Sequence, residues 1–372
     1  MSFRAVLACV GTRPEAIKMA PVIHELVRRG EQVLLVSTGQ HREMLRQALD
    51  TFSLEPDIDL ELMQPAQSLA ELSGRVIPAL DRVLGETRPR MMLVQGDTTT
   101  AMCGALAAFY QHVPVGHVEA GLRTHIANDP FPEETNRRLI GQLAAWHFCP
   151  TPLSAENLLR EAVEQSTVYV TGNTVIDAAL AVAARCTKAA PHVDGRRRVL
   201  VTMHRRESQG EIQRRISHAI AQLAWREDVH VIFPLHLSPT VRASVMPVLD
   251  GHPNVTLCEP LDYEALIAQL CSVELVITDS GGLQEEAPAF NLPVLVMRET
   301  TERPEGVTAG CSILCGTDPD RILAYANALL DDSGAYGEMA GARNPYGDGR
   351  AAERIVDALE AVSQTLSASV LA

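Results

Sequence analysis

Short apolar runs alternate with longer helical patterns along most of the sequence, and this alternation limits the possible folds more than any other feature. Residues 4–10 (RAVLACV), 32–37 (QVLLVS) and 91–95 (MMLVQ) are typical of buried strands. A helical pattern runs from Pro14 to about Arg29, and an alanine-rich one ends at Tyr110. Strands that alternate with helices predict a parallel sheet covered on both faces.

The alternation lapses once, between residues 186 and 197, where the sequence has turn formers and charge but no apolar period. It resumes with apolar runs at 199–202, 229–234, 255–258, 274–278 and 293–297. We therefore expect an α/β protein with two doubly wound Rossmann-like domains, residues 1–185 and 198–372, joined by a linker at about 186–197. The last helical stretch, 350–364, fits either domain, and packing back on the first remains open.

Charge, cysteines and hydropathy exclude several classes of protein. The formal net charge is −14, so a long phosphate backbone would be repelled and nucleic acid is not an expected partner. The eight cysteines are scattered without zinc spacing, and we expect reduced thiols. No apolar run approaches the roughly 18 residues of a membrane span, and the run near the N-terminus is too short for a secretory signal. We expect a cytoplasmic enzyme with no membrane partner.

Polar residues gather where the predicted strands end, which is where doubly wound sheets bind ligands. After the run that ends at Thr278, the segment Ser280-Gly281-Gly282 allows close backbone approach, and a helix begins whose free N–H groups suit a phosphate. Glu286 is placed to accept hydrogen bonds from ribose hydroxyls. The alternative is that Asp279 or Ser280 only caps the helix. The sequence contains neither GxGxxG nor GxxxxGK[ST], so the nicotinamide and P-loop interpretations have no motif to support them.

Basic side chains follow other strand ends. Arg13 and Lys18 lie in GTRPEAIK, His204 lies beside two arginines in HRRES, and Arg303 lies in TERPEG. Taken one at a time, Arg13 and Lys18 are more typical of solvated charges at a helix start than of a ligand site, and a lone histidine is more often structural. Together they predict a site that neutralises a diphosphate, with His204 as an anion contact or proton donor.

Three carboxylates, Asp97, Glu119 and Glu133, come from strand ends in the first predicted domain. Asp97 could instead cap the following helix, and Glu133 or its neighbour Glu134 could complement a helix dipole. Their number favours proton transfer over capping alone. His117 and Glu119 share one face of a strand, but no convincing further ligands follow, and we expect no metal.

Several longer motifs, in order from about residue 4 to 360, resemble those of the non-hydrolysing UDP-N-acetylglucosamine 2-epimerase family. They are GTRPEAIKMAPV, GQHREML, QGDTTT, HVEAGLRT, PFPEETNR, TGNTVIDA, HRRES, TDSGGLQEEAP, TERPEGVTAG and NPYGDG. The resemblance implies a GT-B-like pair of domains with the active site in the interdomain cleft, and a homodimer. It also implies interconversion of UDP-N-acetylglucosamine and UDP-N-acetylmannosamine for cell-surface polysaccharide, with a UDP-sugar as substrate and no cofactor.

The resemblance also implies roles for single residues. Asp97, Glu119, Glu133 and His204 match positions that the family uses in catalysis. The positions that match its nucleotide pocket are Arg13, Lys18, Arg137, Ser280, Gly281, Gly282, Glu286 and Arg303. Leu266 stands where the family often has a phenylalanine against uracil, so we expect weaker base stacking.

The chemistry agrees with this resemblance. No carbonyl activates the hydrogen on carbon 2 of the sugar, and no redox motif is present to oxidise a neighbouring carbon, so elimination and re-addition of UDP is the expected route. It needs a base, an acid and a firmly held diphosphate. Alternatives left open are a hydrolysing relative that releases free N-acetylmannosamine and UDP, a glycosyltransferase, and a non-catalytic sugar-nucleotide sensor.

Overall fold

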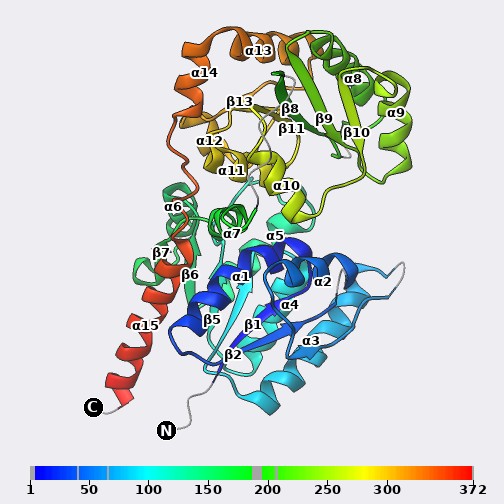
Figure 1. The fold of residues 1–372 in the computed structure, drawn as a ribbon. Coiled ribbons are helices and arrows are strands. Elements are labelled where there is room, and N and C mark those ends of the chain that lie inside the picture. The colour runs from blue at the N-terminus through cyan, green and yellow to red at the C-terminus, as the bar shows by residue number, and fades with distance from the viewer. Residues whose placement is uncertain (1–4, 40–41, 65–66, 187–194, 206–207, 371–372) are drawn as a thin grey trace. The chain divides into compact units, whose positions relative to one another are not determined.

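The computed structural model describes residues 5–39, 42–64, 67–186, 195–205 and 208–370. They form two compact units: the first comprises residues 1–178 with 347–372, and the second comprises 179–346. Each unit is built on a parallel sheet with helices packed against it (Figure 1). The predicted pair of doubly wound Rossmann-like domains is confirmed. Residues 187–194 of the predicted linker lie outside the described residues.

The sheet of the first unit has the order β3-β2-β1-β4-β5-β6-β7. Its strands are β1 (Val6–Val10), β2 (Val33–Ser37), β3 (Ile58–Asp59), β4 (Met91–Gln95), β5 (Val115–Val118), β6 (Trp146–Cys149) and β7 (Val168–Val170). Its helices are α1 (Arg13–Arg28), α2 (Arg42–Thr51), α3 (Leu69–Thr87), α4 (Thr99–Tyr110), α5 (Glu133–Leu143), α6 (Pro152–Arg160) and α15 (Ala351–Val370). Helix α7 (Thr174–Ala183) begins in this unit and ends in the other.

The sheet of the second unit has the order β10-β9-β8-β11-β12-β13. Its strands are β8 (Arg197–Thr202), β9 (Val229–Pro234), β10 (Val255–Cys258), β11 (Leu275–Thr278), β12 (Val294–Val296) and β13 (Ser312–Leu314). Its helices are α8 (Glu211–Ala224), α9 (Pro239–Leu249), α10 (Tyr263–Leu270), α11 (Gly281–Glu286), α12 (Pro304–Thr308), α13 (Pro319–Asp331) and α14 (Ser333–Ala340).

Alternation along the buried strands divides each core between the two faces of its sheet. In the first unit Leu7 and Cys9 of β1 pack with α3 and α4, while Ala8 and Val10 point to the opposite face, where α1 lies. In the second unit Val199 and Val201 of β8 pack with α8, α9 and α13. Burial on both faces explains why these strands are continuously apolar in sequence.

The last helix, α15, packs against α1 of the first unit (Figure 1). Arg29 Nη1, just after α1, lies 2.7 Å from Asp357 Oδ1 and 3.1 Å from Glu360 Oε2. The carboxylate of Asp177 accepts hydrogen bonds from the backbone N–H groups of Ala351 at 3.1 Å and Ala352 at 2.8 Å. A side chain from α7 therefore caps the start of α15, and the sequence had left this packing open.

Both sheets reverse their strand order at one point, between β1 and β4 in the first unit and between β8 and β11 in the second. In doubly wound sheets a crevice opens there, beyond the carboxyl ends of the strands. The residues that follow these strands are therefore the ones best placed to bind a ligand. Among the described residues, no helix is both long and apolar enough to cross a membrane.

Candidate active site

Glu119 follows β5 at the carboxyl edge of the first sheet, and three side chains hold its carboxylate. Oε1 accepts hydrogen bonds from Lys18 Nζ and, at 2.9 Å, from Asn173 Nδ2, while Oε2 accepts one from Gln95 Nε2. The residue is 9% exposed and has a φ of +64°, a left-handed conformation that costs a glutamate roughly 1–3 kcal/mol. The three donors therefore fix a carboxylate in one orientation on a backbone that would not adopt this shape alone.

Asp97 lies near Glu119, two residues beyond β4. Its Oδ2 is 2.6 Å from Arg137 Nη2, and its carbonyl accepts a hydrogen bond from Asn136 Nδ2 at 2.9 Å. Burial raises the pKa of Asp97 above its usual range, Arg137 opposes the rise, and the charge of Glu119 adds to it. The two predicted carboxylates therefore interact electrostatically. Thr98 caps α4 by accepting a hydrogen bond from Ala101 N at 3.0 Å, so the capping role considered for Asp97 belongs to Thr98.

Two buried residues shape the turns around these carboxylates. Glu15 of α1 accepts hydrogen bonds from the backbone N–H groups of Gly11 at 3.0 Å and Thr12 at 2.7 Å, and from Thr98 Oγ1 at 2.6 Å. It ties the turn after β1 to the turn after β4, and burial raises its pKa. His117 Nε2 lies 2.7 Å from the carbonyl of Gly96. Burial lowers the pKa of His117 to about 3, so this histidine is neutral and structural.

The start of α5 separates the two glutamates that the sequence could not distinguish. Glu134 is fully buried and accepts hydrogen bonds from the backbone N–H groups of Thr124 at 3.0 Å and His125 at 3.1 Å. It lies 3.4 Å from Arg137 Nη1 and is the structural member of the pair. Glu133 is partly buried at the first position of α5, and its role in catalysis stays a prediction.

At the edge of the second sheet, Asp279 fixes His204. One oxygen of Asp279 accepts hydrogen bonds from the backbone N–H groups of His204 and Arg205, both at 2.8 Å, and the other lies 2.9 Å from His204 Nδ1. Burial alone would raise the pKa of Asp279, but the hydrogen bonds and charge of His204 lower it overall. The ring is anchored through Nδ1, so Nε2 is the nitrogen turned away from Asp279. Asp279 therefore orients the predicted histidine, whereas the sequence offered it as a helix cap.

Arg303 lies against the Ser280-Gly281 turn at the start of α11. A Cβ built on Gly281 would come within 2.7 Å of Arg303 Nη1, so a larger residue here would displace the guanidinium group from its present place. Arg303 Nε donates to Glu285 Oε1 at 2.6 Å, and Nη1 lies 3.6 Å from Glu302 Oε2. The structure thus brings together the cation and the glycine-containing turn that the sequence predicted for a diphosphate.

The remaining predicted contacts lie around these two edges. Tyr263 of α10 donates from its hydroxyl to Glu286 Oε1 at 3.0 Å, which attaches α10 to α11. Leu266 is partly buried on α10, one helical turn after Tyr263. Arg13 is partly buried at the first position of α1, and Lys18 is bound to Glu119. Their contacts with a nucleotide stay predictions.

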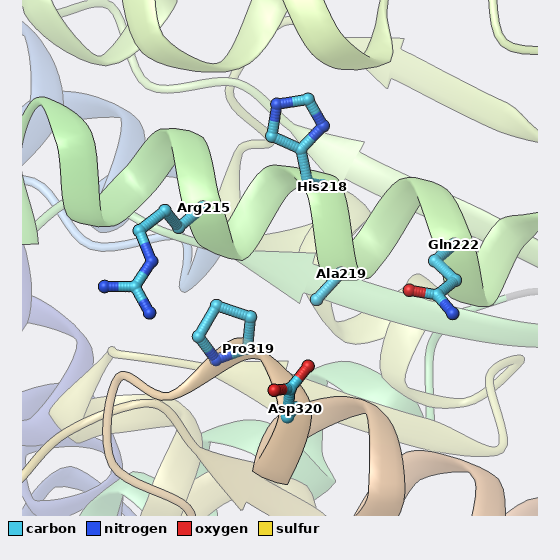
Figure 2. Close-up of a pocket in the computed structure, with 6 residues that line it drawn as sticks. All are labelled: Arg215, His218, Ala219, Gln222, Pro319 and Asp320. Carbon is cyan, nitrogen blue, oxygen red and sulfur yellow. The ribbon is translucent and has the colours of Figure 1, made fainter.

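A hollow of about 300 Å³ lies on the second unit between α8 and α13 (Figure 2). It is lined by Arg215, His218, Ala219, Gln222, Pro319 and Asp320. Figure 2 shows His218 turned away from Pro319 and Asp320, so the polar groups do not converge. This hollow includes none of the predicted site residues and is separate from the candidate site.

The family model of the UDP-N-acetylglucosamine 2-epimerases matches residues 24–360. The chain belongs to this family. The UDP-N-acetylglucosamine 2-epimerase of Escherichia coli strain K12 is 49% identical over 368 residues, which cover 95% of this chain and 98% of that protein. The UDP-GlcNAc 2-epimerase of Neisseria meningitidis, solved bound to UDP-GlcNAc, is 44% identical with a TM-score of 0.89, and the match covers 95% of this chain and 99% of that one. The co-structure of S. aureus MnaA with UDP is 42% identical, also with a TM-score of 0.89, and covers 97% of both chains.

Three residues that shape the site of this epimerase family member were not predicted to do so. Gln95 and Asn173 hold Glu119, and Asp279 holds His204. All three lie in polar motifs at the ends of strands, VQGDTTT, VTGNTVID and ITDSGG, which was the available signal. Arg206, the second arginine of HRRES, lies outside the described residues.

Proposed function

We propose that the protein interconverts UDP-N-acetylglucosamine and UDP-N-acetylmannosamine without releasing free sugar. The observation that carries the proposal is the fixed orientation of the Glu119 carboxylate. Its hydrogen-bond donors are Lys18, Gln95 and Asn173. Asp97, whose pKa is raised by burial, lies in the same unit. Support comes from the E. coli relative named as a UDP-N-acetylglucosamine 2-epimerase and from the Neisseria meningitidis structure with UDP-GlcNAc.

The proposed reaction is an elimination followed by re-addition. A carboxylate removes the proton from carbon 2, the C–H electron pair forms a double bond between carbons 1 and 2, and the bond from carbon 1 to the UDP oxygen breaks. The products are 2-acetamidoglucal and UDP. In the return step a proton is delivered to carbon 2 on the opposite face, and the diphosphate oxygen bonds to carbon 1 again.

Asp97, Glu119 and Glu133 form the proposed proton-transfer set. Burial raises the pKa of Asp97, which suits a group that alternates between its ionised and protonated forms. Lys18 and Asn173 orient Glu119, so its carboxylate needs little reorganisation when charge develops. Which carboxylate serves which face of the sugar is left open in this proposal.

The second unit supplies the proposed nucleotide contacts. The Ser280-Gly281-Gly282 turn and Arg303 bind the diphosphate, and His204, oriented by Asp279, contacts it or donates a proton. Glu286 binds the ribose, and Leu266 takes the position against uracil. Arg13 and Arg137 add positive charge from the first unit. We propose that both sets of residues act on one substrate molecule.

The deciding experiment is incubation of the purified protein with UDP-N-acetylglucosamine in deuterium oxide, followed by NMR. We expect deuterium at carbon 2 of both epimers and an equilibrating pair of nucleotide sugars. Free N-acetylmannosamine that accumulates with UDP would instead identify the hydrolysing reaction. UDP binding without any exchange would identify a non-catalytic sensor.

A single substitution tests the carboxylate that carries the proposal. Glu119→Gln keeps the size of the side chain but removes the basic carboxylate, so we expect loss of exchange at carbon 2. UDP binding should be largely retained, because the proposed nucleotide contacts lie mainly in the second unit. Unchanged turnover in this variant would remove Glu119 from the catalytic set.

We also propose that the product supplies N-acetylmannosamine-type sugars for cell-surface polysaccharide. Deletion of the gene in its host, followed by sugar analysis of the surface polymers, tests this. Loss of an N-acetylmannosamine-derived component is expected, and an unchanged composition would contradict the proposal.

A further inference from the structure

Tyr346 is a buried residue without a role in the proposed reaction, although it lies in the NPYGDG motif. Its side chain is 2% exposed, and it follows α14 in the second unit. Its backbone N–H donates to Asn344 Oδ1 at 2.9 Å, and Asn344 Nδ2 donates to the carbonyl of Glu285 at 3.4 Å. The loop that carries Tyr346 is thereby attached to α11, the helix that begins at Gly281.

The hydroxyl of Tyr346 makes two hydrogen bonds to the start of α12. It donates to the carbonyl of Arg303 at 3.0 Å and accepts from the backbone N–H of Gly306 at 3.0 Å. Arg303 occupies the N-cap position of α12 and makes no side-chain cap. An arginine lacks the side-chain oxygen that a capping residue provides, so Tyr346 supplies the missing acceptor from 40 residues away.

Gly306 is matched to this hydroxyl. A Cβ built on Gly306 would lie 3.0 Å from Tyr346 Oη and 3.0 Å from Ser312 Oγ. This is tighter than ordinary van der Waals contact. The glycine therefore leaves the space in which the hydroxyl reaches the backbone of α12.

The side chain of Arg303 is fixed separately from its main chain. Glu285 Oε1 accepts from Arg303 Nε at 2.6 Å, which directs the guanidinium group toward the backbone of Gly281. The main chain of Arg303 also donates to Thr301 Oγ1 at 3.1 Å, and Tyr346 holds its carbonyl. The arginine side chain has many rotamers, so holding the main chain as well as the guanidinium group narrows the positions that the group can take.

We infer that Tyr346 is a positioning residue of the nucleotide site: its hydroxyl fixes the main chain of Arg303 and so the guanidinium group that lies against the Ser280-Gly281 turn. The inference rests on the proposed function, in which Arg303 contacts the diphosphate of UDP. It gives the NPYGDG motif a role in ligand affinity in addition to its packing in the core.

The test is a double-mutant cycle in the full-length protein, with UDP affinity measured by isothermal titration calorimetry. Tyr346→Phe keeps the buried ring and removes only the hydroxyl. We expect UDP to bind about threefold to tenfold more weakly, because one hydrogen-bonded anchor of Arg303 is lost. In an Arg303→Ala background the same substitution should have little further effect, since the group that it positions is gone.

Tyr336→Phe is the matched control. Tyr336 belongs to α14 of the same unit, and its hydroxyl donates to the carbonyl of Glu274 at 2.9 Å. This substitution also removes a hydrogen bond from a tyrosine hydroxyl to a backbone carbonyl, but the carbonyl is not that of Arg303. It should lower the melting temperature and leave UDP affinity at the wild-type value.

Three outcomes would count against the inference. Wild-type UDP affinity in Tyr346→Phe, with weaker binding in Arg303→Ala, would overturn it and leave the proposed function intact. An equal loss of affinity with and without Arg303 would show that Tyr346 acts by another route and would also overturn it. A wild-type protein that does not bind UDP would overturn both the inference and the proposed function.

Gly306→Ala provides a second, independent variant. Its added methyl group presses on the Tyr346 hydroxyl, so UDP affinity should fall. Gly306→Ala should cause a smaller loss of UDP affinity in the Tyr346→Phe background, because the hydroxyl on which the methyl group presses is absent there. An alanine effect of the same size with and without the hydroxyl would contradict the inference.

Discussion

At the scale of single residues, the site depends on side chains that hold other side chains. The donors to Glu119 come from three separate segments: Lys18 from α1, Gln95 from the end of β4 and Asn173 from the turn before α7. When one donor is replaced, the other two still contact the carboxylate. The orientation of the carboxylate should be more sensitive than the fold.

Asn173→Asp tests that sensitivity. Aspartate keeps the oxygen that accepts from Val175 N at 3.1 Å, but it replaces the amide donor to Glu119 with an acceptor. The change removes a hydrogen bond to a charged group, worth about 1.5–3 kcal/mol, and places a second carboxylate beside Glu119, so we expect exchange at carbon 2 to slow by at least about tenfold. UDP affinity, measured by calorimetry, should not change.

Asn254→Asp is the control for the change in the net charge of the protein. Asn254 Nδ2 donates to the carbonyl of Ala224 at 2.8 Å in the second unit, so the same amide-to-carboxylate change is made far along the chain from Glu119. It should leave the exchange rate unchanged. Equal rates in Asn173→Asp and the wild type would show that Asn173 does not orient the catalytic group.

A pH profile tests the environment of Asp97. Its pKa is raised by burial and held back by Arg137. A base must be ionised, so kcat/KM should fall as the pH drops through this raised pKa. Arg137→Gln removes the charge that favours the ionised form, and the acid limb should therefore move to higher pH. A limb that stays in place would remove Asp97 as the titrating base.

Single residues also show what the sequence could and could not predict. Asp97 and Glu119 were predicted to lie at strand ends of the first domain, and the structure places them after β4 and β5. Their partners were not predicted, because the contacts join residues that are far apart: 24 positions for Gln95 and 54 for Asn173. The apolar pattern predicts at which edge of the sheet a residue lies. It does not predict which side chains from other segments contact that residue.

At the scale of elements, apolar runs predicted strands in both sheets, including the edge strand β10, but missed the edge strands β3 and β13. The runs 91–95, 229–234 and 255–258 match β4, β9 and β10 residue for residue. β3 and β13 were not predicted, and each is the last strand of its sheet. They have two and three residues and include polar ones, so they carry no detectable apolar pattern.

The cap of α15 gives a prediction about stability. Burial raises the pKa of Asp177 from 3.8 to about 6, so the folded protein binds this proton more tightly than the unfolded chain. The stabilising contribution of the proton is complete below about pH 3.8 and is lost as the pH rises through about 6. We expect Asp177→Asn to reduce the change in melting temperature between pH 4.5 and pH 7.5.

Asp331→Asn is the matched control for this measurement. The hydrogen bond from Arg226 lowers the pKa of Asp331 below its usual 3.8, so its stabilising contribution is lost only below that pH. That window lies below the range measured. The change in melting temperature between the two pH values should be the same in Asp331→Asn and the wild type. An unchanged pH response in Asp177→Asn would contradict the assignment.

At the scale of the whole molecule, we expect a homodimer. Phe109 and Tyr110 at the end of α4 are 54% and 60% exposed, and their ring centroids lie 6.3 Å apart. Adjacent exposed aromatic side chains are typical of interface anchors. Light scattering after size-exclusion chromatography should give twice the mass of one chain.

Substitution of the aromatic pair tests the location of the dimer contact. The double variant Phe109→Asp/Tyr110→Asp should shift the protein toward the mass of one chain. A wild-type monomer would contradict the expected dimer. A dimer that persists in the double variant would place the contact on another surface.

The grouping of residues 347–372 with residues 1–178 makes the second unit an insertion within the first. During synthesis the ribosome completes this insertion before it makes α15, so the inserted unit is able to fold while the interrupted one still lacks a helix. A premature stop codon just after Tyr346 should therefore damage the unit that was started first and contains Asp97 and Glu119. The inserted unit should still fold, although it is nearer to the stop codon in sequence.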